Sequence, residues 1–175
     1  MPRRQPLPRL WMMTDERQGD ALFAALARLP EGAGIVFRHY SLEPERRRRL
    51  FDRVRDVARD KEQMLLLAGS ADEASAWGAD GSHGRGPGEG WRSAPVHDLE
   101  QMRAAEAHGA ELLFLSPVFP TRSHPGAVPL GVERFGDLAA QTKLPVIALG
   151  GMNAELFAQL DDAYGWAAID AWSSD

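Results

Sequence analysis

The segment Pro145-Val-Ile-Ala-Leu-Gly-Gly-Met-Asn153 combines a short apolar run, two glycines and a residue suited to cap a helix. A run of this length, bounded by turn residues, is typical of a buried strand. The glycines predict a tight turn, and Asn153 predicts the start of a helix. A strand followed at once by a helix is the repeating unit of a parallel α/β sheet.

The same alternation of short apolar runs and amphipathic stretches extends outward along the whole chain. It predicts strands at 10–13, 34–37, 64–67, 79–82, 94–96, 112–115, 145–149 and 166–169. It predicts helices at 20–29, 44–59, 71–77, 98–108 and 132–141, and one after Asn153. Eight strands with mostly helical crossovers favour an α/β fold of the TIM-type (βα)8 barrel class over an open doubly wound sheet.

The chain has 175 residues, whereas a barrel of this type usually has ~250. One missing helix and one shortened helix account for the difference in length. The stretch 84–90, with four glycines and a proline, cannot form a stable helix and replaces the fourth one. Only six residues follow Ile169, so the last helix is truncated. We therefore expect a flexible N-terminal lead-in at 1–9 and one barrel domain at 10–175, with part of its wall bare unless the N-terminal tail or a second subunit, as in a homodimer, covers it.

Charge and composition exclude several classes of function. The formal net charge of -5 argues against nucleic acid as a partner. The basic run at 46–49 is expected to be a solvated helix face rather than a binding patch. No apolar run approaches the roughly 20 residues that span a bilayer, so no membrane partner is expected. Cysteine is absent, which excludes disulfides and fits a reducing compartment, so we expect a cytoplasmic protein.

The active site of a (βα)8 barrel lies where the strands end at their carboxyl side. After the sixth expected strand, Thr121 and Ser123 can present hydroxyls and backbone N–H groups to an anion, although a rigid surface turn is the simpler interpretation. After the seventh, Gly150 and Gly151 let the backbone approach a phosphate at a helix start, or simply make a tight turn. The five histidines lack metal-binding spacing, so no histidine metal site is expected.

Several of these segments, in this order, resemble the thiamine phosphate synthase/TenI family. The resemblance is carried by Leu10-Trp-Met-Met-Thr-Asp15, Gly78-Ala-Asp-Gly-Ser-His83, Val96-His97-Asp98, Gly109-Ala-Glu-Leu-Leu-Phe-Leu-Ser-Pro-Val-Phe-Pro-Thr121, Pro125-Gly126, Leu130-Gly131 and the segment 145–153 quoted above. It implies a barrel that joins hydroxymethylpyrimidine diphosphate to a thiazole phosphate, with magnesium and basic side chains assisting the departure of pyrophosphate.

The family's site residues are only partly present in this chain. Of the family's Gln-x-Arg-x-Lys motif, which falls on Val36, Arg38 and Tyr40, only Arg38 is kept. The Asn-Asp pair that binds pyrophosphate and magnesium falls on about Ala68 and Gly69, neither of which has a side-chain ligand. Magnesium is therefore a cofactor by resemblance only.

Other positions of the family's site fall on the loops after the last three strands. The family's loop lysine falls on His124 and its final serine falls on Asp170, whose charge would repel a phosphate. The acid/base histidine of the TenI tautomerases falls on Pro117, which cannot transfer protons. His124, His97 or His83 could supply a substitute base.

The resemblance implies a thiamine phosphate synthase-like protein of thiamine biosynthesis, a transferase that joins or binds a phosphorylated thiazole and a phosphorylated pyrimidine. Arg38 and His124 are the candidate catalytic residues. The candidate phosphate-binding residues are Thr121, Ser123, Gly150 and Gly151. The alternative is a catalytically inactive family member that binds a ligand or a partner protein.

Overall fold

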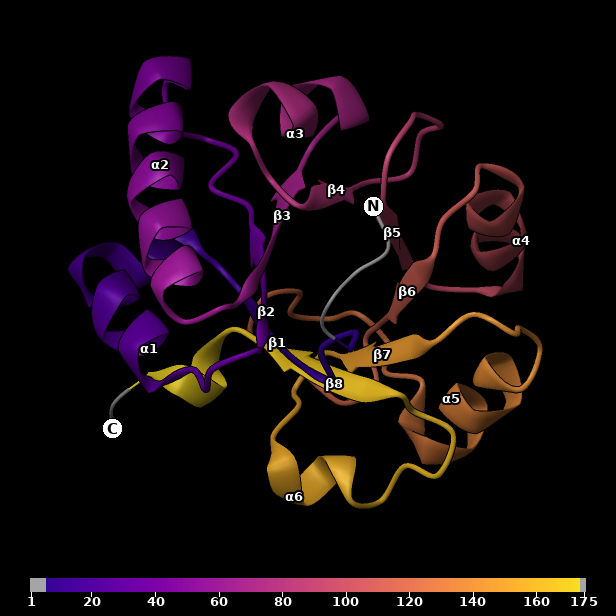
Figure 1. Cartoon of the computed structure of the whole chain (residues 1–175). Helices are drawn as coiled ribbons and strands as arrows, with labels where there is room; N and C mark the ends of the chain where they lie inside the picture. Colours follow the sequence, from indigo (N-terminus) through magenta and orange to yellow (C-terminus); the bar gives the residue numbers. More distant parts are fainter. Residues whose placement is uncertain (1–5, 174–175) are drawn as a thin grey trace.

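A computed structural model of the chain describes residues 6–173, which form a closed barrel of parallel strands in chain order (Figure 1). The strands are β1 (Leu10–Met13), β2 (Gly34–Phe37), β3 (Met64–Ala68), β4 (Gly81–His83), β5 (Arg92–Val96), β6 (Leu112–Leu115), β7 (Val146–Leu149) and β8 (Gly165–Ala168). Each strand pairs in parallel with the next, and β8 closes the ring on β1. The prediction of a short (βα)8 barrel is confirmed.

Helices cover the outside of the ring (Figure 1). They are α1 (Leu22–Arg28), α2 (Pro44–Asp60), α3 (Ala71–Trp77), α4 (Leu99–Ala107), α5 (Gly131–Ala139) and α6 (Ala154–Phe157), with 3-10 turns η1 (Glu16–Ala21) and η2 (Asp170–Trp172). The expected caps are present, because the Asp98 side chain accepts from the Gln101 N–H and the Asn153 side chain from the Leu156 N–H. The helix expected at 20–29 is instead divided, because residues 20–21 belong to η1 and α1 begins at Leu22.

The core has an inner and an outer part. Inside the ring, Trp11, Phe114 and Ile147 are completely buried, with the Trp11 and Phe114 rings packed edge to face at 5.4 Å. Outside the ring, two further apolar clusters fill the space between strands and helices. This packing fixes the strands, so the loops at their carboxyl ends are held on a rigid support.

The two places where the helical shell is incomplete are closed by single side chains. Between β4 and β5, Arg92 is buried and donates to the carbonyl oxygens of Gly88 and His108, so it ties the glycine-rich loop to the end of α4. After β8, Trp172 stacks on Trp166 at 5.5 Å, and the η2 turn that contains it lies beside α1 (Figure 1). The expectation of a bare wall is therefore wrong for most strand residues under these two gaps, which one chain buries, while Gly81 and Pro95 are half-buried.

The N-terminal segment closes the floor of the barrel. The Trp11 indole donates to the Pro8 carbonyl at 2.8 Å, and the Tyr164 hydroxyl donates to the Leu7 carbonyl at 2.7 Å. Residues 1–5 of the expected lead-in lie outside the described residues. Within residues 6–173, the structure contains no helix with the length and apolarity needed to cross a membrane.

A buried polar pair lies inside the ring, where β4 and β5 meet. His83 Nδ1 lies 2.8 Å from Ser93 Oγ, and the His83 ring packs edge to face on Phe114. Burial, reinforced by the charge of Arg38, lowers the pKa of His83 from 6.5 to about 3. The imidazole is therefore neutral in the folded protein at neutral pH.

This shift predicts a loss of stability in mild acid. Folding lowers the pKa of His83. The unfolded chain therefore binds a proton at His83 below pH 6.5, whereas the folded chain binds it only below about pH 3. From about pH 7.5 to about pH 5, the free energy of unfolding should fall by about 2 kcal/mol from His83 alone. Urea unfolding at both pH values measures it.

A matched pair of variants isolates the contribution of His83. His83→Gln should remove about 2 kcal/mol of the pH dependence, whereas His108→Gln, at an exposed position, should keep it. Burial also lowers the pKa of His39, which adds a loss in the same direction and remains in both variants. An unchanged pH dependence in His83→Gln would show that His83 is protonated equally in both states.

Candidate functional site

A cavity of about 570 Å³ opens at the carboxyl ends of the strands, and we call it the mouth cavity. Its walls come from the loops after β6, β7 and β8, with Arg38 after β2 and His97 after β5. All six residues that sequence reasoning selected line it, namely Arg38, Thr121, Ser123, His124, Gly150 and Gly151. The closed barrel brings these positions together although they are spread over more than a hundred residues.

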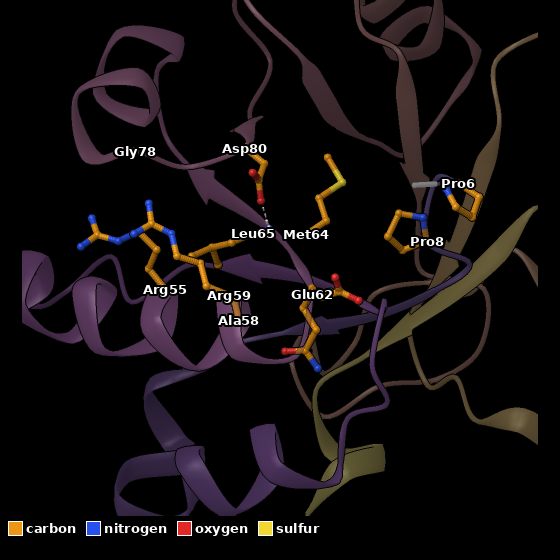
Figure 2. A pocket seen from close by; sticks show the side chains of 11 residues that line it. Pro6, Pro8, Arg55, Ala58, Arg59, Glu62, Met64, Leu65, Gly78 and Asp80 are labelled. Atoms are coloured by element: carbon orange, nitrogen blue, oxygen red, sulfur yellow. Dashed lines mark hydrogen bonds between the residues drawn. The ribbon is translucent and has the colours of Figure 1, made fainter. Parts of the chain in front are cut away.

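A second cavity, of about 370 Å³, lies at the opposite end of the barrel and is lined by residues such as Pro8, Arg59, Met64 and Asp80 (Figure 2). Its charged groups are mixed in sign. Asp80 already accepts the Leu65 N–H at 2.8 Å, and Arg55 donates to the Trp77 carbonyl at 2.9 Å. These groups hold the fold together, and barrel enzymes carry their chemistry at the other face.

The loop after β6 is held down by backbone hydrogen bonds. Val118 N–H donates to the Leu149 carbonyl at 2.9 Å, and Phe119 N–H donates to the Gly150 carbonyl at 3.1 Å. The loop returns over itself, since Leu130 N–H donates to the Pro117 carbonyl at 2.8 Å. This part of the loop is thus fixed against the turn after β7, and its tip is set over the cavity.

The loop tip places two hydroxyl groups at the cavity. Ser123 N–H donates to Thr121 Oγ1 at 3.2 Å, which sets the two side chains on the same turn. Both side chains are partly exposed and line the cavity. Hydroxyls and backbone N–H groups on one turn can donate several hydrogen bonds to a bound anion.

The turn after β7 brings its backbone close to the β6 loop because it lacks side chains. Gly150 has a φ of 102°, and a Cβ there would lie 2.7 Å from Pro117 Cα. Gly151 has a φ of 63°, and a Cβ there would lie 2.4 Å from the Pro120 carbonyl oxygen. Glycine is therefore required at both positions for this approach.

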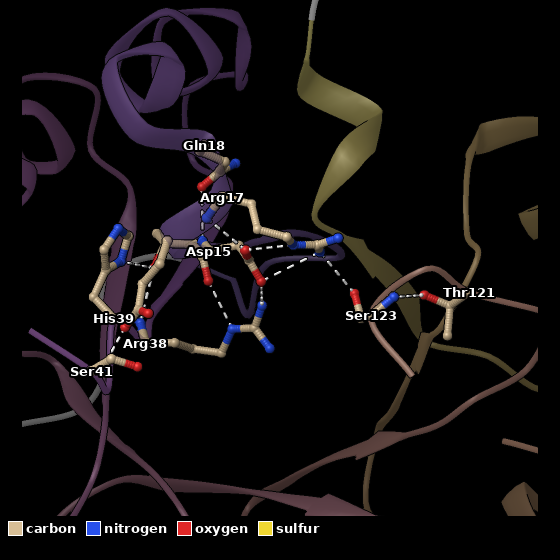
Figure 3. Close-up of polar contacts among 10 residues, drawn as sticks. Asp15, Arg17, Gln18, Arg38, His39, Ser41, Thr121 and Ser123 are labelled. Carbon is tan, nitrogen blue, oxygen red and sulfur yellow. Dashed lines mark hydrogen bonds and ion pairs between the residues drawn. The ribbon is translucent and has the colours of Figure 1, made fainter. Parts of the chain in front are cut away.

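Arg38 is fixed by the end of β1 (Figure 3). Its Nε donates to the Thr14 carbonyl at 2.7 Å, and its Nη2 lies 3.0 Å from the Asp15 carboxylate. Burial lowers the pKa of Arg38, while the charge of Asp15 opposes this effect. The guanidinium stays charged, as arginine does in proteins, and is oriented at the edge of the mouth cavity.

Arg17 contacts the same carboxylate as Arg38, that of Asp15, and sequence reasoning did not select it. Its Nε donates to Asp15 Oδ1 at 2.8 Å, and its Nη2 donates to Ser123 Oγ at 3.1 Å across the mouth (Figure 3). The hydrogen bond to Asp15 raises the pKa of Arg17. Burial alone would raise the pKa of Asp15, but the hydrogen bonds and charges of the two arginines outweigh it and lower that pKa.

The histidines and Asp170 occupy different parts of this face. His124 and His97 line the cavity, with His97 Nδ1 2.7 Å from the Ser116 carbonyl oxygen. His83 is buried in the ring with its pKa lowered, so the expectation that it could act as a base at the mouth is wrong. Asp170 lines the cavity and lies 3.9 Å from Arg122, which offsets its charge there.

A magnesium ion does not fit at the end of β3, where the resemblance placed its ligands. The Arg47 guanidinium is buried there and donates to the Ala68 carbonyl at 2.8 Å and to the Arg38 carbonyl at 2.9 Å. A Cβ on Gly69 would lie 2.6 Å from the Glu73 carboxylate, which itself pairs with Arg47 at 3.5 Å. A fixed cation thus occupies this place, and no side-chain oxygen of residues 68 and 69 replaces the missing ligands.

The basic run at 46–49 is only in part the solvated face that was expected. Arg47 is buried among Phe37, Tyr40 and Trp77, each within 5.8 Å of its guanidinium carbon. Arg46 and Arg49 are exposed. One member of the run is therefore part of the core that supports the mouth.

Comparison with known proteins gives one consistent result. Residues 93–171 match the family described as Thiamine monophosphate synthase. A relative named putative thiamine-phosphate synthase 2, from Aquifex aeolicus, is 32% identical over 93% of this chain and 96% of its own.

Solved structures share the fold of this chain. The thiamine phosphate pyrophosphorylase from Pyrococcus furiosus superposes with a TM-score of 0.77 at 26% identity, over 93% of this chain and 86% of that one. The N-acetylmannosamine-6-phosphate 2-epimerase from Clostridium perfringens has a TM-score of 0.64 at 15% identity, over 94% and 87% of the two chains, and shows the fold alone.

Proposed function

Because the chain belongs to the thiamine monophosphate synthase family, we propose that its mouth cavity binds thiazole phosphate and accepts the pyrimidine diphosphate beside it. Family membership supports a role in thiamine biosynthesis. The observation that carries the proposal is the meeting of the Thr121 and Ser123 hydroxyls, the Gly150-Gly151 backbone and the Arg38 guanidinium around one cavity. Hydroxyl groups, nearby backbone N–H groups and a fixed cation are the groups that bind phosphate oxygens in proteins.

Each of these groups has a distinct part in the proposed complex. Thr121 and Ser123 donate to the phosphate oxygens, and the two glycines let the backbone come within contact of the same group. His124 replaces the family's lysine as a hydrogen-bond donor at the rim. Arg38 faces the negative charge of the diphosphate.

The proposed reaction breaks the bond between the pyrimidine methylene carbon and the diphosphate oxygen, and forms a bond from that carbon to the thiazole nitrogen. Pyrophosphate leaves with the electron pair of the broken bond. Arg38 stabilises this departing charge, which is electrostatic work that a preoriented cation performs well. No step is assigned to a metal ion, because Arg47 fills the place where its ligands would stand.

A second candidate function follows from the same observation at the end of β3. Without side-chain metal ligands there, the chain would bind its phosphorylated ligand and act as a non-catalytic member of the family. A cytoplasmic location is a further proposal that rests on the absence of cysteine. A homodimer, which the sequence suggested as a cover for part of the barrel wall, is likewise a proposal.

Turnover and binding together separate the two candidates. The purified chain is incubated with hydroxymethylpyrimidine diphosphate, thiazole phosphate and magnesium, beside the Pyrococcus furiosus protein as a reference. We expect thiamine phosphate to form more than about 10²–10³-fold more slowly than with the reference, because the loss of one electrostatic group already costs this much and several are missing. Binding of thiazole phosphate without any product would favour the non-catalytic candidate. Neither binding nor product would contradict both.

A further inference from the structure

Arg17 spans the mouth from one side to the other. It follows β1, where Asp15 caps the η1 turn and Gln18 completes the capping box. From there its guanidinium extends to Ser123 Oγ, on the loop after β6, at 3.1 Å (Figure 3). The two residues are 106 positions apart in the chain.

The hydroxyls of the β6 loop have no fixed cation from their own loop. Arg122 lies between Thr121 and Ser123, but its side chain is largely exposed and its Nε is directed to Asp170 at 3.9 Å. Arg38 is tied to the end of β1 through Thr14 and Asp15. Among the residues described, Arg17 is the arginine that donates to one of these hydroxyls.

We propose that Arg17 is a substrate-binding residue that holds the phosphate group at the Thr121-Ser123 turn. The proposal rests on the proposed function and deepens it, because it makes the site selective for the phosphorylated thiazole over the same thiazole as a free alcohol.

The charges around the cavity agree with this assignment. Arg38, Arg122 and Asp170 line the cavity, and the pair of Arg17 and Asp15 lies at its edge, where Arg17 contacts Ser123. The neighbouring Glu16 carboxylate accepts the Ser41 N–H at 2.6 Å, away from the β6 loop. The single carboxylate of Asp15 pairs with both Arg17 and Arg38. One positive charge of this group is therefore left unbalanced and can pair with an anion.

The hydrogen bonds of Arg17 also leave it able to bind a phosphate group. The Nε bond to Asp15 at 2.8 Å can persist while the terminal nitrogens turn from Ser123 to a phosphate oxygen. The Ser123 hydroxyl only accepts in this contact, so its own O–H can donate to the same phosphate. The Arg17 side chain is 50% exposed, so this movement needs no change in the core.

Calorimetry with two ligands and three proteins tests the assignment. Wild type, Arg17→Gln and the control Arg103→Gln are titrated with thiazole phosphate and with the unphosphorylated thiazole alcohol. Arg103 is a matched control because its side chain is 52% exposed and pairs with one carboxylate, that of Glu106 at 2.9 Å, outside the mouth. Circular dichroism and thermal melts verify that all three proteins are folded.

Arg17→Gln should bind thiazole phosphate about tenfold to a hundredfold more weakly and the alcohol within about twofold of wild type, since only a charged hydrogen bond is lost. Arg103→Gln should leave both affinities unchanged. Equal weakening for both ligands would show that Arg17 only stabilises the loop after β6, and would overturn the assignment. An unchanged affinity for thiazole phosphate would overturn it too. A wild type that binds neither ligand would instead overturn the proposed function, and with it the role of Arg17.

Discussion

Gly150→Val should abolish thiazole phosphate binding and lower the free energy of unfolding by about 2–4 kcal/mol. A φ of 102° is strained for any residue with a Cβ, and the Cβ would lie 2.7 Å from Pro117 Cα and 3.1 Å from the Val118 nitrogen. These are backbone atoms, so the conflict can be relieved only by moving the β6 loop off the β7 turn. That movement separates Thr121 and Ser123 from the Gly150-Gly151 backbone, and the cavity loses its shape.

Denaturant unfolding and calorimetry measure the two effects of this change. Gly86→Val is the control, because Gly86 lies in the glycine-rich loop and a Cβ there meets nothing within 4 Å. The control should change stability by no more than about 0.5 kcal/mol and leave binding intact. If Gly150→Val bound thiazole phosphate as tightly as wild type, binding would not depend on the contact between these two loops.

Arg47→Met should lower the free energy of unfolding by about 2–4 kcal/mol. Methionine keeps much of the apolar volume among Phe37 and Trp77 but removes the donors to the Arg38 and Ala68 carbonyls. A buried carbonyl that loses its donor costs about 1–3 kcal/mol. Because one of these carbonyls belongs to Arg38, the change should also weaken ligand binding at the mouth.

The neighbouring arginine is the control for Arg47. Arg46 is exposed on the same helix, so Arg46→Met removes the same charge without removing a buried contact. It should change stability by no more than about 0.5 kcal/mol in urea unfolding at neutral pH. Equal effects of the two substitutions would show that Arg47 acts through net charge and not through the buried carbonyls.

Much of the fold could be predicted from the sequence, because most strands are continuous apolar runs bounded by turn residues. The strands at Leu10–Met13, Gly34–Phe37 and Leu112–Leu115 lie where the pattern predicted them. The fourth and fifth strands were less accurately placed. They contain buried polar residues, His83 and Arg92, whose partners Ser93, Gly88 and His108 become neighbours only in the closed barrel.

The candidate site was predictable where it depends on strand-end loops and not where it depends on long side chains. Thr121, Ser123, Gly150 and Gly151 follow directly from the order of strands. Arg17 was missed because only its contact with Ser123, far along the chain, reveals that it reaches the mouth. The pair Asp15-x-x-Gln18, which forms the capping box, was a local signal that a turn would fix the neighbouring side chains there.

Arg47 shows a similar limit. In the sequence it is one of four consecutive arginines, and a charged run in a helix is usually solvated. Its helical phase places it toward β3, where its guanidinium donates to the Ala68 carbonyl. The end of β3 thus holds a buried guanidinium at the place where the resemblance predicted metal ligands.

The crystal structure of the chain in complex with thiazole phosphate tests the central claim most directly. The account predicts that the phosphate lies in the mouth cavity, within hydrogen-bonding distance of the Thr121 and Ser123 hydroxyls and of the Gly150-Gly151 backbone, with Arg17 turned toward it. A phosphate bound in the cavity at the opposite end of the barrel, or a thiazole phosphate that leaves the mouth empty, would contradict the account.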